Sequence, residues 1–119
     1  FLDRANRYLF STDVVYLRDL YLMNPDSSVS AYVASLERLV TYMDSVDRLY
    51  PSHGPSPISP AVITDMAAGM RAVADGREPD EVDEDPILDG GVGAVPTREQ
   101  IRIHDFCTFR ILVSSHAQL

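Results

Sequence analysis

Apolar positions near the start of the chain form a continuous run that predicts a strand over residues 8–16. Its apolar members are Tyr8, Leu9, Phe10, Val14, Val15 and Tyr16. An unbroken run of this kind is typical of a strand that is covered on both faces. Asp13 interrupts the run, and a carboxylate beside buried residues is costly unless it is paired or binds a metal.

The clearest periodicity predicts an α-helix over residues 29–46 with one apolar stripe. The stripe consists of Val29, Tyr32, Val33, Leu36, Leu39, Val40, Met43 and Val46. Ser27 or Ser28 can cap the start of this helix, because a serine hydroxyl accepts a hydrogen bond from a free backbone N–H in the first turn.

Three further strands and a second helix complete the predicted elements. A short strand is expected over residues 47–50. The second helix is expected to begin after Ser59 as its N-cap and to end at Gly76. Residues 101–104 and 106–113 alternate between apolar and polar positions and are predicted to be closing strands.

An acidic stretch separates the second helix from the closing strands. Residues 78–89 hold seven acidic side chains and two prolines, which predicts a solvated, mobile loop. A calcium-binding loop is disfavoured because the central glycine and the closing glutamate are missing at the required spacing. The glycine-rich residues 90–93 indicate a plain turn, since no phosphate-binding motif follows them.

Composition narrows the functional classes. The chain has 119 residues, enough for one domain or less, and a formal net charge of −8. All ten basic residues are arginine, which excludes a P-loop lysine and a Schiff-base lysine on these residues. The acidic balance argues against a nucleic-acid surface, and no apolar run approaches the ~18 residues of a membrane span.

The start of the sequence and the single cysteine indicate processing and compartment. The sequence begins at Phe1 without an initiator Met or a secretory leader, so we expect an internal piece or a processed product. Cys107 lies in an apolar, strand-like run and is expected to be a small buried hydrophobe. A reducing compartment fits this composition, and we expect a cytoplasmic protein.

Asp13 and His53 are the candidate metal ligands. Each follows an apolar, strand-like run with a helix between them, so both are expected at one edge of a sheet. Gly54 lets the backbone turn sharply after His53, and the flanking Pro51 and Pro55 stiffen the loop. Two ligands are fewer than the three of a usual catalytic site. The alternative is a loop histidine and a turn or cap carboxylate without a metal.

These elements occur in the order of a known superfamily. Residues 10–13 (Phe-Ser-Thr-Asp) resemble the strand and aspartate of the metallo-β-lactamase superfamily, and residues 32–39 resemble the helix that follows. Residues 49–55 (Leu-Tyr-Pro-Ser-His-Gly-Pro) resemble the last-histidine loop, which commonly contains Pro-Gly-His-Gly-Pro. Residues 63–76 and 90–113 resemble the next helix and the closing strands, so the similarity covers nearly the whole chain.

The resemblance implies an α/β (α+β) fold that is one half of a four-layer αββα sandwich, a mixed sheet with two helices on one face. It implies a metal-dependent hydrolase in which a metal-bound hydroxide attacks an ester, thioester, lactone or lactam of a small-molecule substrate. Asp13 would bridge two zinc ions, or iron, and His53 would ligate the second. Tyr16, three residues after Asp13, matches an oxyanion-contacting tyrosine of some lactonase-like members, with packing as its alternative role.

The chain departs from the family in lacking its His-x-His-x-Asp-His motif. His104 and His116 match no family ligand and are expected at the surface. Residues 1–119 therefore resemble the C-terminal half of the domain, which cannot assemble the site alone. Two alternatives remain, a non-catalytic truncated fragment stabilised by oligomerisation and half of a flavodiiron-type oxidoreductase.

A missing half would leave an apolar sheet face exposed. Phe10, Val14, Ile111 and Val113 are the residues expected on it. We therefore expect the chain to associate with the missing N-terminal half or with a second copy, as a dimer or a domain swap.

Overall fold

The computed structural model describes residues 1–88, 96–115 and 117–119. The predicted turn at residues 90–93 and His116 lie outside these described residues. The elements are, in chain order, β1 (Leu2–Asp3), β2 (Tyr8–Thr12), β3 (Asp19–Leu22), α1 (Val29–Val40), the 3₁₀ turn η1 (Met43–Ser45), β4 (Arg48–Pro51), α2 (Ala61–Ala74), β5 (Glu81–Leu88), β6 (Pro96–Asp105) and β7 (Arg110–Ser114).

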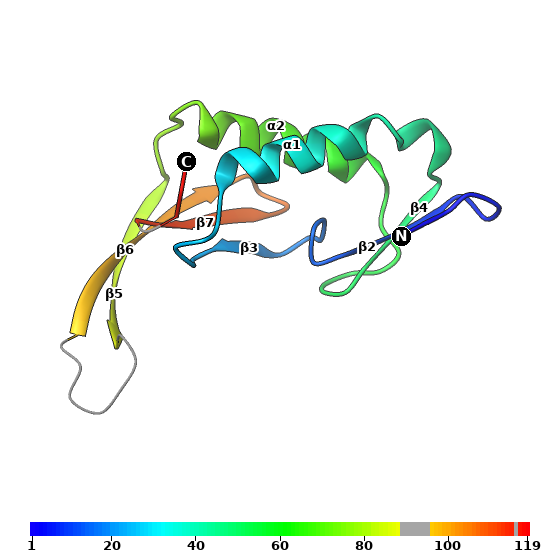
Figure 1. Cartoon of the computed structure of the whole chain (residues 1–119). Coiled ribbons are helices and arrows are strands. Elements are labelled where there is room, and N and C mark those ends of the chain that lie inside the picture. Colours follow the sequence, from blue (N-terminus) through cyan, green and yellow to red (C-terminus); the bar gives the residue numbers. More distant parts are fainter. Residues whose placement is uncertain (89–95, 116) are drawn as a thin grey trace.

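Two mixed sheets lie beneath a layer of two helices (Figure 1). One sheet has the order β1-β2-β4, with β2 and β4 parallel. The other has the order β3-β7-β6-β5, with β3 and β7 parallel and the remaining pairs antiparallel. The predicted α+β class, with both helices on one side, is confirmed.

Helix α1 forms where the apolar stripe predicts it. The Ser28 hydroxyl accepts a hydrogen bond from the Ala31 N–H at 3.2 Å, which confirms the predicted cap. The helix ends at Val40, earlier than predicted, because both the N–H and the hydroxyl of Thr41 bond to the carbonyl of Arg38. This contact tightens the last turn, and the chain continues through η1 towards β4.

Helix α2 begins and ends close to the predicted residues. The Ser59 hydroxyl accepts from the Ala61 N–H at 3.2 Å at its start. At its end, Gly76 adopts a φ of 95°, and its N–H bonds to the carbonyl of Val73 at 3.1 Å. The next N–H, that of Arg77, bonds back to the carbonyl of Ala72, which completes a Schellman motif that satisfies the last carbonyls of the helix.

The apolar run over residues 8–16 is not one strand. Thr12 has a φ of 50°, and the Val14 N–H bonds back to the Ser11 carbonyl at 3.0 Å. This turn ends β2, and the chain then enters the other sheet as β3. The run is nevertheless buried at its end, because Val15 and Tyr16 belong to the hydrophobic core.

The hydrophobic core lies between the helices and one face of the sheets. Ile111 and Val113 belong to this core, so the prediction that they lie on an exposed apolar face is wrong. Their register partners on β3 are the buried Leu20 and Leu22, which place them on the helix side. Phe10 and Val14 are exposed, as predicted.

The loop expected over residues 78–89 is instead largely the edge strand β5. It pairs antiparallel with β6 from Glu81 opposite Ile103 to Leu88 opposite Pro96. The side chains of residues 81–84 are exposed. Main-chain pairing holds this strand, and an edge position tolerates both charged residues and proline. The loop predicted from the acidic composition is therefore wrong.

Two expected environments near the end of the chain are also corrected. His104 is buried rather than at the surface, because its register partner is Ile111 on the helix side of the sheet. Cys107 is exposed rather than buried, because it lies in the turn between β6 and β7 with a φ of 70°. The Asp105 carboxylate accepts the Cys107 N–H at 2.8 Å and fixes this turn.

Candidate metal centre

Strands β2 and β4 bring the two predicted ligands to one sheet edge. The strands are parallel, with Phe10 opposite Tyr50 and Thr12 opposite Pro51. Their carboxyl ends therefore lie side by side, and the Ser52 N–H bonds to the Thr12 carbonyl at 3.1 Å just before His53.

The side chains of Asp13 and His53 are in direct contact. The Nε2 atom of His53 lies 3.0 Å from Oδ1 of Asp13. Both side chains are more than half exposed, so the pair faces solvent. The predicted juxtaposition at a sheet edge is thus confirmed, whereas the metal-binding role of the two residues stays a prediction.

The turn that carries Asp13 is anchored on both sides. The Ser11 hydroxyl is buried and donates to the Val15 carbonyl at 2.8 Å. From helix α1, the Tyr32 hydroxyl donates to the Val14 carbonyl. These bonds fix the backbone on either side of Asp13, so its carboxylate projects from a defined turn.

The loop that carries His53 depends on Gly54. This glycine has a φ of 75°, in the left-handed region that disfavours a side chain. A Cβ atom here would lie 3.0 Å from the Leu17 carbonyl oxygen and 3.4 Å from the Cγ atom of Arg18. Gly54 therefore lets the histidine loop pack closely against the segment that follows Asp13.

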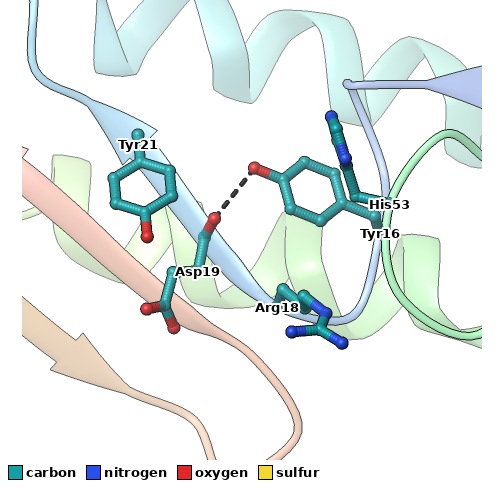
Figure 2. Close-up of a pocket in the computed structure, with 5 residues that line it drawn as sticks. All are labelled: Tyr16, Arg18, Asp19, Tyr21 and His53. Atoms are coloured by element: carbon teal, nitrogen blue, oxygen red, sulfur yellow. Dashed lines mark hydrogen bonds between the residues drawn. The ribbon is translucent and has the colours of Figure 1, made fainter.

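Tyr16 lies beside the pair, but its hydroxyl is already engaged. Its ring meets the imidazole of His53 edge-on, with centroids 5.5 Å apart. The hydroxyl donates to the Asp19 carbonyl at 2.8 Å (Figure 2). Burial, and secondarily the charge of Asp13, raises the pKa of this phenol. An oxyanion contact would require Tyr16 to break its present bond, and that role stays a prediction.

An open pocket of about 350 Å³ adjoins His53. It is lined by Tyr16, Arg18, Asp19, Tyr21 and His53 (Figure 2). Sequence analysis did not single out Arg18, Asp19 or Tyr21. The signal that could have found them is the charged Arg-Asp pair placed directly after an apolar run that already carried Tyr16.

Asp19, on the wall of this pocket, forms a bidentate ion pair with Arg110. The guanidinium of Arg110 donates to both carboxylate oxygens of Asp19, at 2.8 and 2.5 Å. These hydrogen bonds hold the pKa of the Asp19 carboxyl below its usual range. The bidentate pair joins β3 to β7 and neutralises the acidic wall of the pocket.

The spacing of Asp13 and His53 suits two ligands of one metal ion. Ligands of a tetrahedral zinc ion, bound at ~2.0–2.2 Å, lie about 3.3 Å apart. The observed 3.0 Å between Nε2 and Oδ1 needs to widen by only a few tenths of an ångström. Among the described residues no group of three or more His, Cys, Asp or Glu side chains could hold a metal, so the pair is at most a partial site.

No protein-family model, curated protein or solved structure matches this chain. In the described part of the chain, no helix is both long and apolar enough to span a bilayer. Fold and geometry together thus define an α+β protein that presents an aspartate–histidine pair where two parallel strands end.

Proposed function

We propose that this chain is the C-terminal half of a metallo-β-lactamase-like αββα domain and supplies Asp13 and His53 to a zinc-dependent hydrolase site. The observation that supports the proposal most is the contact of these two side chains at adjoining strand ends. The substrate class is a small ester, thioester, lactone or lactam. The proposal also rests on the ordered motifs of the sequence.

The two side chains have complementary roles in such a site. An aspartate offers two oxygens and can bridge two cations, and a neutral imidazole is a common zinc ligand. Zinc, or iron, would supply Lewis-acid chemistry when bound. The anchored turn of Asp13 and the close packing at Gly54 preorganise both ligands, which reduces the cost of ordering them on binding.

The remaining ligands must come from outside these residues. We propose that the missing N-terminal half, or a second copy of the chain, covers the face of the β1-β2-β4 sheet that the helices leave open. An aromatic cluster marks this face and is made of Phe1, Tyr8, Phe10 and Tyr50. Tyr8 and Phe10 alternate along β2 with the buried Leu9, which places them on the side away from the helices.

Zinc titration of the full chain tests the metal role. We expect zinc to bind the unmodified chain, and we expect Asp13→Ala and His53→Ala each to weaken zinc binding at least about ten-fold. The matched control is Asp47→Ala, because Asp47, like Asp13, is an exposed carboxylate in contact with a basic side chain, here that of Arg7 at 3.0 Å. This control should bind zinc as the unmodified chain does. Equilibrium dialysis with metal analysis gives the stoichiometry.

Two outcomes would contradict the hydrolase proposal. If the unmodified chain binds no zinc, or if both site variants retain its affinity, Asp13 and His53 form only a surface contact, and the alternative of a non-catalytic fragment is favoured. Binding of iron in clear preference to zinc would instead favour the flavodiiron-type alternative.

A further inference from the structure

The pocket beside His53 contains one exposed cation, the guanidinium of Arg18, which makes no close ion pair with the described residues. Asp19 is paired with Arg110, so this acidic wall carries no free charge. Arg18 is exposed and forms no hydrogen bond or close ion pair with any residue that the structure describes, although its charge, after the hydrogen bonds from Arg110, also helps to lower the pKa of the Asp19 carboxyl. Four other arginines, Arg7, Arg71, Arg77 and Arg110, each form an ion pair. The pocket therefore presents a guanidinium whose donors are available to a ligand.

Packing places the side-chain stem of Arg18, a lining residue of the pocket, beside the histidine loop. The Cγ atom of Arg18 approaches Gly54 so closely that a Cβ atom there would lie 3.4 Å away. The stem of Arg18 thus lies against the loop that carries His53. Figure 2 shows Arg18 and Tyr21 on two sides of the pocket, with Tyr16 between Tyr21 and His53.

The opposite wall is aromatic and accessible. Tyr21 is 63 % exposed and lies on β3, the edge strand of its sheet. An exposed ring beside a pocket offers an apolar surface on which a flat ligand can lie. The pocket therefore combines an apolar wall with one cationic group, the combination that binds a small organic anion with a planar body.

Because the chain is acidic, a cation at the position of Arg18 is needed for an anionic ligand to bind in this pocket. The chain carries a formal net charge of −8, which repels anions at long range, so an anionic ligand needs a local cation. A guanidinium presents parallel N–H donors that match the two oxygens of a carboxylate. Arg18 supplies this group within the same pocket as His53, next to the candidate metal ligands.

We propose that this pocket is a carboxylate-binding subsite, in which Arg18 binds the carboxylate of an aromatic or similarly flat substrate and Tyr21 contacts its apolar body. That this ligand is the substrate rests on the proposed function. The inference adds the chemical class of that substrate, a flat carboxylate. The carboxylate on Arg18 positions the rest of the molecule beside Asp13 and His53.

Binding of phenylacetate to the metal-free full chain tests the subsite. The chain is treated with a chelator and titrated while backbone and side-chain NMR shifts are followed. We expect shifts at Arg18, Tyr21 and His53, and we expect the neutral isostere phenylacetamide to bind about ten-fold more weakly, since it loses a charge-assisted pair. Equal binding of the acid and the amide, or no binding of the acid, overturns the proposal.

Variants assign the effect to one side chain. Arg18→Gln should weaken phenylacetate binding about ten-fold, and Arg18→Lys should retain part of it. The matched control is Arg48→Gln, because Arg48 is an exposed arginine at the start of β4, outside the pocket, and this variant should bind as the unmodified chain does. Unchanged binding by Arg18→Gln overturns the proposal.

The two proposals fail separately, because this titration contains no metal. Phenylacetate binding without zinc binding would leave a carboxylate pocket on a protein that is not a metallohydrolase. Zinc binding without phenylacetate binding would leave the metal site and remove the subsite.

Discussion

At the scale of single residues, His104 is a buried histidine beside a cationic side chain. Its Nδ1 atom lies 3.3 Å from the guanidinium of Arg77, which also pairs with Asp80 at 2.9 Å and stacks on Phe106. Burial, and secondarily the charge of Arg77, lowers the pKa of His104. The nearby Asp80 partly opposes this effect, and Arg102 adds to it. The folded protein therefore favours neutral His104.

This environment predicts a pH dependence of stability. Because the folded pKa of His104 lies below the unfolded value of ~6.5, the unfolded chain binds the proton first as the pH falls. The free energy of unfolding should therefore decrease as the pH falls from ~6.5 towards the folded pKa. Urea unfolding of His104→Gln between pH 5 and 8 should show a weaker decrease.

The pH window separates this effect from that of the carboxylates. Hydrogen bonds from Arg110 and Arg77 lower the pKa values of Asp19 and Asp80. Stability that depends on these carboxylates is lost only as the pH falls below ~3.9, the usual value of an aspartate. A decrease of equal size in His104→Gln and in the unmodified chain above pH 5 would contradict the assignment to His104.

Sequence pattern identifies some of these residues and misplaces others, for one physical reason. Alternation in β6 separates the face of Ile101 and Ile103 from the face of Arg102 and His104, but it does not say which face a helix covers. His104 lies on the helix side, where it is buried and lines a cavity together with Val73 of α2. Arg102 lies on the same side of the sheet, but its side chain is exposed. Only tertiary packing distinguishes the two positions.

At the scale of elements, the approach of the histidine loop to the segment after Asp13 organises the candidate site. Gly54 and Gly76 both have positive φ values, 75° and 95°. A Cβ atom on Gly54 would meet the Leu17 carbonyl at 3.0 Å, whereas a Cβ atom on Gly76 would meet nothing within 4 Å. An alanine at position 76 would therefore suffer backbone strain alone, whereas an alanine at position 54 would suffer both backbone strain and a steric conflict.

Matched alanine substitutions test this difference. Gly76→Ala should cost about 1–2 kcal/mol in the free energy of unfolding, from left-handed strain alone. Gly54→Ala should cost more than Gly76→Ala and should also displace the His53 loop, because its Cβ atom conflicts with backbone. Urea unfolding measures the cost, and the NMR shifts of His53 report the displacement. Unchanged His53 shifts in Gly54→Ala would contradict the role assigned to this glycine.

Elements with a long apolar pattern could be predicted from the sequence, whereas others could not, among them the four-residue strand β3, although it buries Leu20 and Leu22, and strand β5, which is held mainly by backbone pairing. The stripe of α1 and the apolar runs of β2, β4 and β7 are visible as patterns, because they bury side chains in the core. Strand β5 has exposed side chains at residues 81–84 and is held by its ladder to β6. The pairing of β2 with β4, which brings Asp13 to His53, was predictable because both strands end in a candidate ligand.

At the scale of the whole molecule, the chain is extended and both of its helices lie on one side of the sheets. Its radius of gyration is 15.9 Å, compared with about 13.5 Å expected for a compact domain of this length. Both helices lie over one face of the sheets, and the β5–β6 pair projects from the body (Figure 1). The other face carries the aromatic cluster of Phe1, Tyr8, Phe10 and Tyr50. An apolar face of this kind is a candidate surface for association.

Association through the aromatic face is the whole-molecule prediction. Phe10 is 40 % exposed and stacks on Tyr50 with ring centroids 5.4 Å apart, so it lies within the cluster. We expect the chain to self-associate at micromolar concentration when no partner is present, and we expect Phe10→Asp to weaken association at least about ten-fold, because a buried unpaired charge is costly. Val82→Asp is the control, since Val82 is an exposed apolar residue on β5, outside the cluster, and this variant should associate normally.

Light scattering and sedimentation velocity measure the association, and urea unfolding shows whether each variant remains folded. Because apolar surface is removed from water on association, the midpoint of unfolding should rise with protein concentration for the unmodified chain and for Val82→Asp. It should depend less on concentration for Phe10→Asp. A well-folded monomer of the unmodified chain at micromolar concentration would contradict the prediction, because the aromatic face would then be stable in water without a partner.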